Sequence, residues 1–163
     1  MFKSRIFLGL LLLSAAYIAC KKNDPFNSEA QLAIDTAKIR EFLDTSGITA
    51  TKDPSGLFYL MVVEGEDTAA TPSLEDSIRV AYTGRILGDT TAFETVTESA
   101  PRSYLLSQRI EGWRTGLSMT KEGGQIRLFI PSSLAYRDFV QSGIPANTIL
   151  DFTIDLLKVV KKK

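Results

Sequence analysis

The chain has 163 residues with 19 basic and 19 acidic side chains, no histidine and one cysteine. This length supports one globular domain with its own core, and the balanced charge excludes the basic field that nucleic-acid binding requires. The single cysteine excludes an intramolecular disulfide, and the absence of histidine excludes its usual acid–base and metal chemistry.

The N-terminal residues have the pattern of an export signal. Lys3 and Arg5 precede an apolar segment of 14 residues, 6–19, which is too short to span a bilayer comfortably and suits a secretory signal. It ends in Tyr-Ile-Ala-Cys20, which resembles the lipobox of bacterial lipoproteins, although Tyr17 stands where leucine is usual. We therefore predict a lipoprotein signal peptide over residues 1–19 and lipidation of Cys20, with a free thiol as the alternative.

A short polar segment follows the predicted cleavage site. Residues 20–28 contain Pro25 and few apolar side chains, so we expect a lipidated tether. Lys21 and Lys22, and not an aspartate, directly follow Cys20. This pattern resembles known signals for sorting to the outer membrane. We expect a location in the cell envelope, lipid-anchored in the outer membrane on its periplasmic face or its surface.

The next segment has helical signals at both ends. Ser28 and Gln31 form the pattern of a capping box, and Gly47 is a C-terminal stop, which predicts an N-terminal helix over residues 29–46. One apolar face at helical spacing comprises Leu32, Ile39, Phe42 and Leu43. This face predicts packing, either on the domain that follows or on a second copy of the same helix.

From Gly56 onward the hydrophobic period changes to two, which indicates strands with one buried face. The three clearest alternating runs are 77–82, 125–130 and 150–156, and weaker strands are predicted at 57–63, 84–87 and 103–106. The one helical candidate in this region is residues 111–119. A curved antiparallel sheet wrapped on one short helix makes an α+β domain, predicted over residues 57–161.

The sequence contains no ordinary catalytic motif. It lacks a Gly-x-Ser-x-Gly nucleophile elbow, a Walker loop and a dinucleotide-binding glycine loop, and Gly123-Gly124 is typical of a plain turn. We therefore expect no metal and no cofactor. Eight aromatic side chains nevertheless fall within residues 82–152. On composition alone they either form the core or line an apolar cleft. They are Tyr82, Phe93, Tyr104, Trp113, Phe129, Tyr136, Phe139 and Phe152.

The order of the motifs favours the cleft. The chain reads VAYTGRILGD at 80–89, Phe-Glu at 93–94, RIEGWRTGL at 109–117, IPSSLAY at 130–136 and IPANTILDFTIDLL at 144–157. In this order and at this spacing the motifs closely resemble the FKBP-type peptidyl-prolyl isomerases, over about residues 57–160. The layout from Cys20 onward also looks like that of FKBP lipoproteins of Bacteroidetes-type bacteria.

The resemblance implies a pocket for proline with Trp113 as its floor, so we expect the indole to be partly accessible. The other implied roles fall on eight residues. Tyr82, Phe93 and Phe152 would form the aromatic walls, and Glu94 would replace an aspartate that accepts a hydrogen bond from Tyr82. The Ile110 amide, with Arg109 beside it, and the Tyr136 hydroxyl would bind the substrate backbone. Ile144 would lie on the loop over the pocket. Expected partners are proline-containing polypeptides and the macrolide ligands that pockets of this family accept.

Such chemistry needs neither acid nor base. Amide resonance sets the barrier to X-Pro rotation at about 18–20 kcal/mol, and water stabilises the planar amide by hydrogen bonding its oxygen. An apolar pocket that excludes this water and fits the twisted form better than either planar isomer lowers the barrier by differential binding. A chain without histidine can therefore be an enzyme.

Five positions depart from the family pattern. Glu94 replaces aspartate, Arg109 replaces an apolar residue, Arg102 occupies a rim position that is usually aromatic, Arg137 replaces glycine and Ala146 replaces a second proline. The leading function is a proline isomerase that assists folding outside the cytoplasm. One alternative is a chaperone or adaptor that binds proline-containing segments with little turnover, and another is a surface lipoprotein that uses the fold only as a scaffold.

Overall fold

A computed structural model describes residues 26–141 and 143–162 of the chain. The predicted signal peptide, Cys20 and most of the predicted tether lie outside the described residues. The helices are α1 (Ser28–Ser46) and α2 (Glu111–Ser118), with the short 3-10 turns η1 (Leu106–Gln108) and η2 (Ser132–Leu134). The strands are β1 (Thr51–Lys52), β2 (Phe58–Val63), β3 (Ser77–Ile86), β4 (Ala92–Val96), β5 (Arg102–Leu105), β6 (Gln125–Ile130) and β7 (Leu150–Val160).

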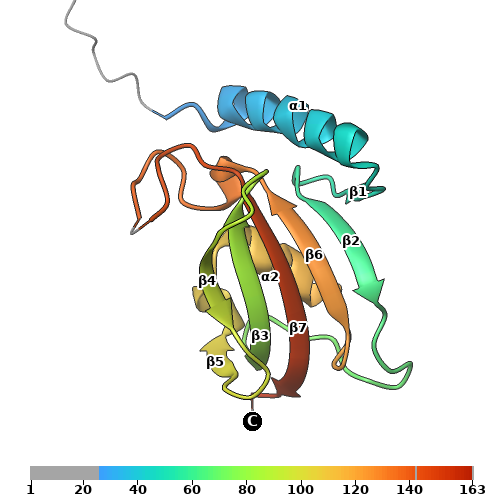
Figure 1. Cartoon of the computed structure of the whole chain (residues 1–163). Helices are drawn as coiled ribbons and strands as arrows, with labels where there is room; N and C mark the ends of the chain where they lie inside the picture. The colour runs from blue at the N-terminus through green and yellow to red at the C-terminus, as the bar shows by residue number, and fades with distance from the viewer. Residues whose placement is uncertain (1–25, 142, 163) are drawn as a thin grey trace, which may run out of the picture.

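The strands form one antiparallel sheet, which confirms the predicted α+β class. Its order is β1-β2-β6-β7-β3-β4, and β5 pairs with the first part of β3. Figure 1 shows α2 behind this curved sheet and α1 across one of its ends. The three alternating runs in the sequence became β3, β6 and β7, the strands at the centre of the sheet. The sheet therefore has a covered face and an outer face along most of its length.

Two details of the strand prediction were wrong. Residues 84–87 are not a separate strand, because β3 continues without a break to Ile86 and pairs with β7 along its length. Strand β4 was not predicted at all. Only Val96 in it is buried, so the strand lacks the apolar alternation that marks the others. It is held by its backbone pairing with residues 82–85 of β3.

Two glycines let α2 lie close against β6. Gly112 and Gly116 are four residues apart, so they share one face of the helix. A Cβ at Gly116 would lie 2.5 Å from Cδ2 of Leu128, and a Cβ at Gly112 would collide with Ile130. The close approach places Trp113 and Leu117 in the main core, where both are buried. This contact fixes the position of the indole relative to the sheet.

Helix α1 begins one residue earlier than the capping-box prediction. Asn27, not Ser28, is the N-cap, and its side chain accepts a hydrogen bond from the Ala30 amide. Gln31 does not reach back to the cap, because its side-chain amide donates to Asp35 at 2.8 Å. The predicted stop at Gly47 is confirmed, with a left-handed φ of 65°.

The apolar face of α1 packs on the domain rather than being left for a second copy. Ile39 and Leu43 join Phe58, Phe129 and Ile149 in a second core on the outer face of the sheet. The ring of Phe42 lies over Phe129 with the centroids 6.0 Å apart. The other predicted member of the face, Leu32, packs on Gly56, where a Cβ would lie 2.7 Å from its Cδ1.

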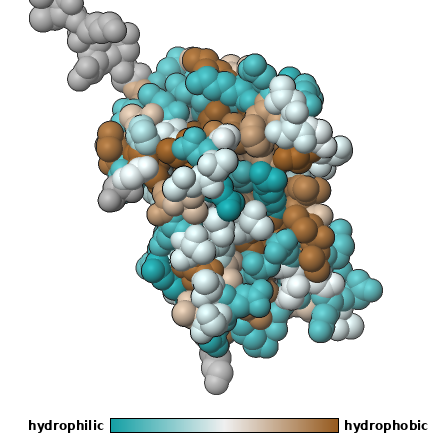
Figure 2. Space-filling view, viewed as in Figure 1, coloured by the Kyte–Doolittle hydropathy of each residue, from teal (hydrophilic) through white to brown (hydrophobic). Residues whose placement is uncertain are grey.

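The described surface is a mixture of polar and isolated apolar residues. Figure 2 shows hydrophilic residues over much of the face seen in Figure 1, with scattered hydrophobic ones between them. The large exposed apolar side chains include Phe139 and Val140 in the loop before β7 and Val62 and Val63 at the end of β2. Within residues 26–141 and 143–162, no helix combines the length and apolarity needed to cross a membrane.

Candidate active site

Nine residues line a hollow of about 270 Å³ between the covered face of the sheet, α2 and the loop after η2. They come from four strands, from the segment before α2, from α2 and from that loop. Seven of the nine are predicted site residues, whereas the predicted residues Phe93 and Ile144 are not in the lining. The lining comprises Tyr82, Glu94, Tyr104, Gln108, Arg109, Ile110, Trp113, Tyr136 and Phe152.

Trp113 is enclosed by three aromatic rings set nearly perpendicular to it. The centroids of Tyr82 and Phe152 lie 5.0 and 5.2 Å from the indole at 86° and 89°, and that of Tyr104 lies 6.3 Å away at 78°. Edge-to-face packing of this kind stabilises each ring and holds it in one orientation. The indole is only 4% exposed, less than we expected. It forms the inner end of the pocket and not an open platform.

The indole nitrogen is another feature of the pocket. Nε1 of Trp113 is buried and has no hydrogen-bond partner among the described residues. Buried N–H groups are nearly always satisfied, so this donor is available to an acceptor that enters the pocket.

Phe93 lies behind the lining and supports it. Its ring packs edge-on against Phe152 at 5.6 Å, and both rings occupy the space over Gly84 in β3. A Cβ at Gly84 would lie 2.6 Å from Phe152 and 2.7 Å from Phe93. Phe152 therefore lines the pocket, and Phe93 packs behind it and fixes that ring. Sequence reasoning missed Gly84, although it stands in the VAYTGR motif.

The polar mouth of the pocket is arranged differently from the prediction. Glu94 accepts from the Arg102 guanidinium at 2.6 Å, not from Tyr82. The Tyr82 hydroxyl instead lies 3.1 Å from the Tyr104 hydroxyl. Arg109 does not approach Glu94 either, because its guanidinium lies over the Tyr104 ring, 4.4 Å from the centroid. Tyr104 therefore makes the contact with Tyr82 that we expected of Glu94, and it also contacts Arg109.

The Tyr82 and Tyr136 hydroxyls stay protonated at neutral pH. Burial raises the pKa of Tyr82, and the neighbouring Tyr104 hydroxyl and Glu94 carboxylate raise it further. Burial also raises the pKa of Tyr136, the charge of Glu94 adds to the increase, and the charge of Arg109 opposes it. Tyr136 can therefore act as a neutral donor to a bound carbonyl.

The two predicted isoleucines differ in their placement. Ile110 is the N-cap of α2 and lines the pocket, and its amide has no backbone acceptor among the described residues. That N–H is available for a bound carbonyl. Ile144 is 5% exposed and belongs to the main core. Its side chain packs inward from the loop and is not in the pocket lining, so its substrate-binding role stays a prediction.

Two of the lining residues were not predicted as site residues. Tyr104 stands in the aromatic set, and the pairing of β5 with β3 places it opposite Ile78, next to the strand that carries Tyr82. Strand pairing was not visible in the sequence. Gln108 belongs to no motif, and only the turn η1 brings it to the pocket.

The comparisons with known proteins agree with this geometry. A model of the FKBP-type peptidyl-prolyl cis-trans isomerase family matches residues 68–157. The chain belongs to this family. It is 36% identical over 115 residues to the FKBP-type peptidyl-prolyl cis-trans isomerase FkpA of Aeromonas hydrophila, which covers 71% of this chain and 41% of that protein. With FkpA of Escherichia coli strain K12 it shares 32% identity over 151 residues, covering 90% of this chain and 54% of that protein.

Solved structures show the same FKBP fold. The crystal structure of FkpA from Escherichia coli matches with a TM-score of 0.69 at 33% identity, covering 82% of this chain and 62% of that chain. The structure of AtFKBP13 matches with a TM-score of 0.57 at 25% identity, covering 68% of this chain and 98% of that chain. The chain spans about half the length of the curated relatives described above.

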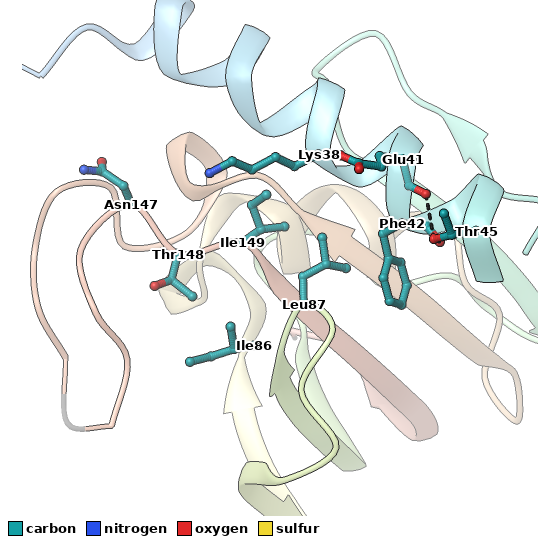
Figure 3. A pocket seen from close by; sticks show the side chains of 9 residues that line it. All are labelled: Lys38, Glu41, Phe42, Thr45, Ile86, Leu87, Asn147, Thr148 and Ile149. Carbon is teal, nitrogen blue, oxygen red and sulfur yellow. Dashed lines mark hydrogen bonds between the residues drawn. The ribbon is translucent and has the colours of Figure 1, made fainter.

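A larger hollow than the aromatic pocket lies elsewhere on this FKBP-type chain. It has a volume of about 490 Å³ and lies between α1, the end of β3 and the loop before β7. Figure 3 shows Phe42, Leu87 and Ile149 facing one another in it, with Lys38 and Glu41 on the helix above. These apolar side chains belong to the second core or pack on it. Volume alone does not select a site, whereas the aromatic pocket also has polar groups that converge on it.

Proposed function

We propose that this protein is a peptidyl-prolyl cis-trans isomerase that assists the folding of exported polypeptides. The observation that carries the proposal is the set of three rings around Trp113, with available donors at Ile110 and Tyr136 beside them. The pocket would hold the proline ring between aromatic faces, and the donors would bind carbonyl oxygens of the substrate backbone. No step in this mechanism transfers a proton.

Catalysis would arise from differential binding. Apolar walls remove water from the amide oxygen, and this weakens the hydrogen bonding that favours the planar amide. The Ile110 amide and the Tyr136 hydroxyl hold the flanking backbone while the bond rotates, so the twisted form is positioned before it is reached. The pKa increases at Tyr82 and Tyr136 keep both hydroxyls as neutral donors through the physiological range.

Refolding of a model protein whose slow step is X-Pro isomerisation tests this function. The soluble fragment 21–163 is expected to accelerate the slow phase at a small fraction of the substrate concentration. The same experiment separates the isomerase from the chaperone or adaptor alternative, which would act only at stoichiometric amounts. A slow phase that is unchanged at every concentration would reject both.

We also propose that the protein is a lipoprotein of the outer membrane, anchored through Cys20. The supporting observations are the charged and apolar segments before Cys20 and the two lysines after it. Multiple acyl chains hold a protein on a membrane far more tightly than one chain does. Cys20→Ser is therefore expected to move the protein from the membrane fraction to the soluble fraction. A serine variant that still sediments with membranes would contradict the anchor.

A further inference from the structure

A smaller hollow adjoins the aromatic pocket, and three of the ten residues that line it are arginines. It has a volume of about 260 Å³ and shares Gln108, Arg109 and Ile110 with the pocket. Arg114 from α2 and Arg137 from the loop after η2 complete its cationic wall, and the one acidic residue in the lining is Glu111. The two hollows therefore have a common wall and are neighbours on the surface.

The cations of this hollow have no anionic partners within the described chain. Neither Arg109, Arg114 nor Arg137 forms an ion pair with a described residue. Arg102 nearby pairs with Glu94, and Arg127 on the outer face pairs with Asp151. Three arginines against one glutamate leave an excess of positive charge around a concave surface, which attracts an anionic group.

Two buried polar atoms at this place also lack partners. Ser133, which is 5% exposed, has an Oγ without a hydrogen bond among the described residues, and so does Nε of Arg109. Both residues line the hollow. Buried polar groups are nearly always hydrogen-bonded, so a ligand that supplies partners for these two atoms gains binding free energy.

The backbone at Arg137 is a third, independent observation. Its φ is +58°, in the left-handed region that glycine adopts freely. An L-residue is sterically unfavourable there, because its Cβ lies too close to the following carbonyl oxygen. A side chain held in an unfavourable backbone conformation points to a functional role, and here the side chain adds a guanidinium to the wall of the hollow.

We infer that this hollow is a subsite for the carboxylate of an aspartate or glutamate close to the proline of the substrate. The inference rests on the proposed isomerase function and deepens it, because it names the substrate class. Guanidinium groups bind carboxylates in bidentate geometry, and the Ser133 hydroxyl is a further donor. Neighbouring residues of an extended peptide are about 3.3 Å apart. Because the two hollows share three lining residues, we place the acidic residue within one or two positions of the proline.

Matched proline peptides test the subsite. Each pair differs only by glutamate or glutamine, placed one or two positions before or after the proline. We expect kcat/KM to favour glutamate by about three- to tenfold at low salt at one of these positions. The preference should shrink in 0.5 M salt, because the cations are partly exposed and are screened. Equal rates for every pair, or a preference for glutamine, would overturn the subsite.

Two variants assign the preference to this hollow. Arg114→Gln removes one guanidinium, and Arg137→Gly removes another while placing glycine where the backbone suits it, so that folding is retained. Each is expected to reduce the glutamate preference at least twofold. Arg79→Gln on β3 removes one exposed charge that lines neither hollow and should leave the preference unchanged. A preference that survives both hollow variants, or that falls equally in Arg79→Gln, contradicts the inference.

The peptide assays distinguish a failure of the subsite proposal from a failure of the isomerase proposal. If neither peptide of any pair is turned over, the isomerase function is rejected. Calorimetric titration of the same peptides then decides the subsite on binding alone, because tighter binding of the glutamate peptide supports it and equal binding overturns it. If both peptides of every pair are turned over at one rate, the isomerase stands and the subsite fails.

Discussion

The Asp35 carboxylate on α1 accepts two hydrogen bonds from Ser132, a residue 97 positions later in the chain. Its Oδ2 lies 2.8 Å from the Ser132 amide and 2.6 Å from the Ser132 hydroxyl, and its Oδ1 accepts from Gln31. Asp35 and Ser132 are fully buried. Ser132 begins the turn η2, which leads directly to Tyr136. The N-terminal helix therefore holds the loop that carries a pocket residue.

Replacing Asp35 should weaken both the fold and the pocket. Asp35→Ala leaves the Ser132 amide and hydroxyl buried without an acceptor, so we expect a loss of about 2–3 kcal/mol in the free energy of unfolding. Urea denaturation measures this loss. Ser132→Ala is the matched control, because it removes the hydroxyl but keeps the hydrogen bond from the backbone amide of residue 132 to Asp35. The free energy of unfolding should fall clearly less in Ser132→Ala than in Asp35→Ala. Equal losses would mean that the hydrogen bond from the Ser132 backbone amide contributes nothing to stability.

The close contact between α2 and β6 gives a second prediction. Gly116→Ala adds a methyl group 2.5 Å from Leu128 in a filled core, so either the side chain or the helix must move. Overpacking of this kind costs about 1–3 kcal/mol, although alanine is the better helix former. Thermal unfolding should show a lower Tm. Thr115→Ala, on the same helix, should change stability by about 0.5 kcal/mol or less, and a stabilised Gly116→Ala would disprove the close packing.

The sequence predicted the central strands and most of the pocket, and the omissions have physical causes. Period-two alternation put Phe129 on the polar face of β6, yet it is fully buried because α1 covers that face. Periodicity reports which residues share a face, but it does not report what packs on the second face. The Arg102–Glu94 pair depends on β4 and β5 both pairing with β3, and the Asp35–Ser132 contact joins segments 97 residues apart. No local sequence pattern encodes either arrangement.

Asp76 makes stability depend on pH at the acidic end. Its buried carboxylate accepts hydrogen bonds from Ser73, Lys161 and the Lys162 amide. These bonds lower its pKa well below the ordinary 3.8, and the bond from the Ser73 amide has the largest effect. An acid with a lowered folded pKa stabilises the fold above its unfolded pKa and loses that contribution as the pH falls through the folded value. Stability should therefore fall below about pH 4.

Acid titration of the free energy of unfolding measures this effect. Asp76→Asn should be less stable at neutral pH and should show a shallower loss between pH 4 and pH 2. Asp89→Asn removes an exposed carboxylate from the turn after β3 and should keep the wild-type slope. An Asp76→Asn slope equal to that of the wild type would mean that other carboxylates cause the acid sensitivity.

Trp113 provides a spectroscopic test of the pocket, because it is the only tryptophan. A proline peptide or a macrolide ligand that enters the pocket must contact the indole or the rings around it, so binding should change the fluorescence. Trp113→Phe should lower peptide affinity, because a smaller ring leaves a gap between Tyr82 and Phe152. An emission spectrum unchanged at saturating ligand, with binding shown independently by calorimetry, would place the ligand elsewhere.

Glu94 decides how far the departures from the family pattern limit the rate. Its carboxylate pairs with Arg102 at the half-exposed rim, and the Tyr82 hydroxyl lies against the Tyr104 hydroxyl instead. Glu94→Asp shortens the side chain by one methylene, which weakens the reach to Arg102 and returns the negative charge toward the pocket. Misplacement by about 1 Å can cost a hundredfold in rate. We therefore expect Glu94→Asp to raise the isomerisation rate constant with little change in peptide affinity, and Glu94→Ala to lower it.

The effect of Glu94 is best tested together with a change at Arg102 rather than at Arg109. If the ion pair holds Glu94 out of position, Arg102→Gln should also raise the rate, and its effect with Glu94→Asp should be less than the sum, because each change breaks the same contact. Arg109→Val should not reproduce this gain, since Arg109 lies over Tyr104 and not against Glu94. Steady-state assays on the three single variants and the double variant measure these effects. If neither Glu94→Asp nor Arg102→Gln changes the rate constant, Glu94 has no role in catalysis. Catalysis would then depend on the aromatic rings and the backbone donors alone.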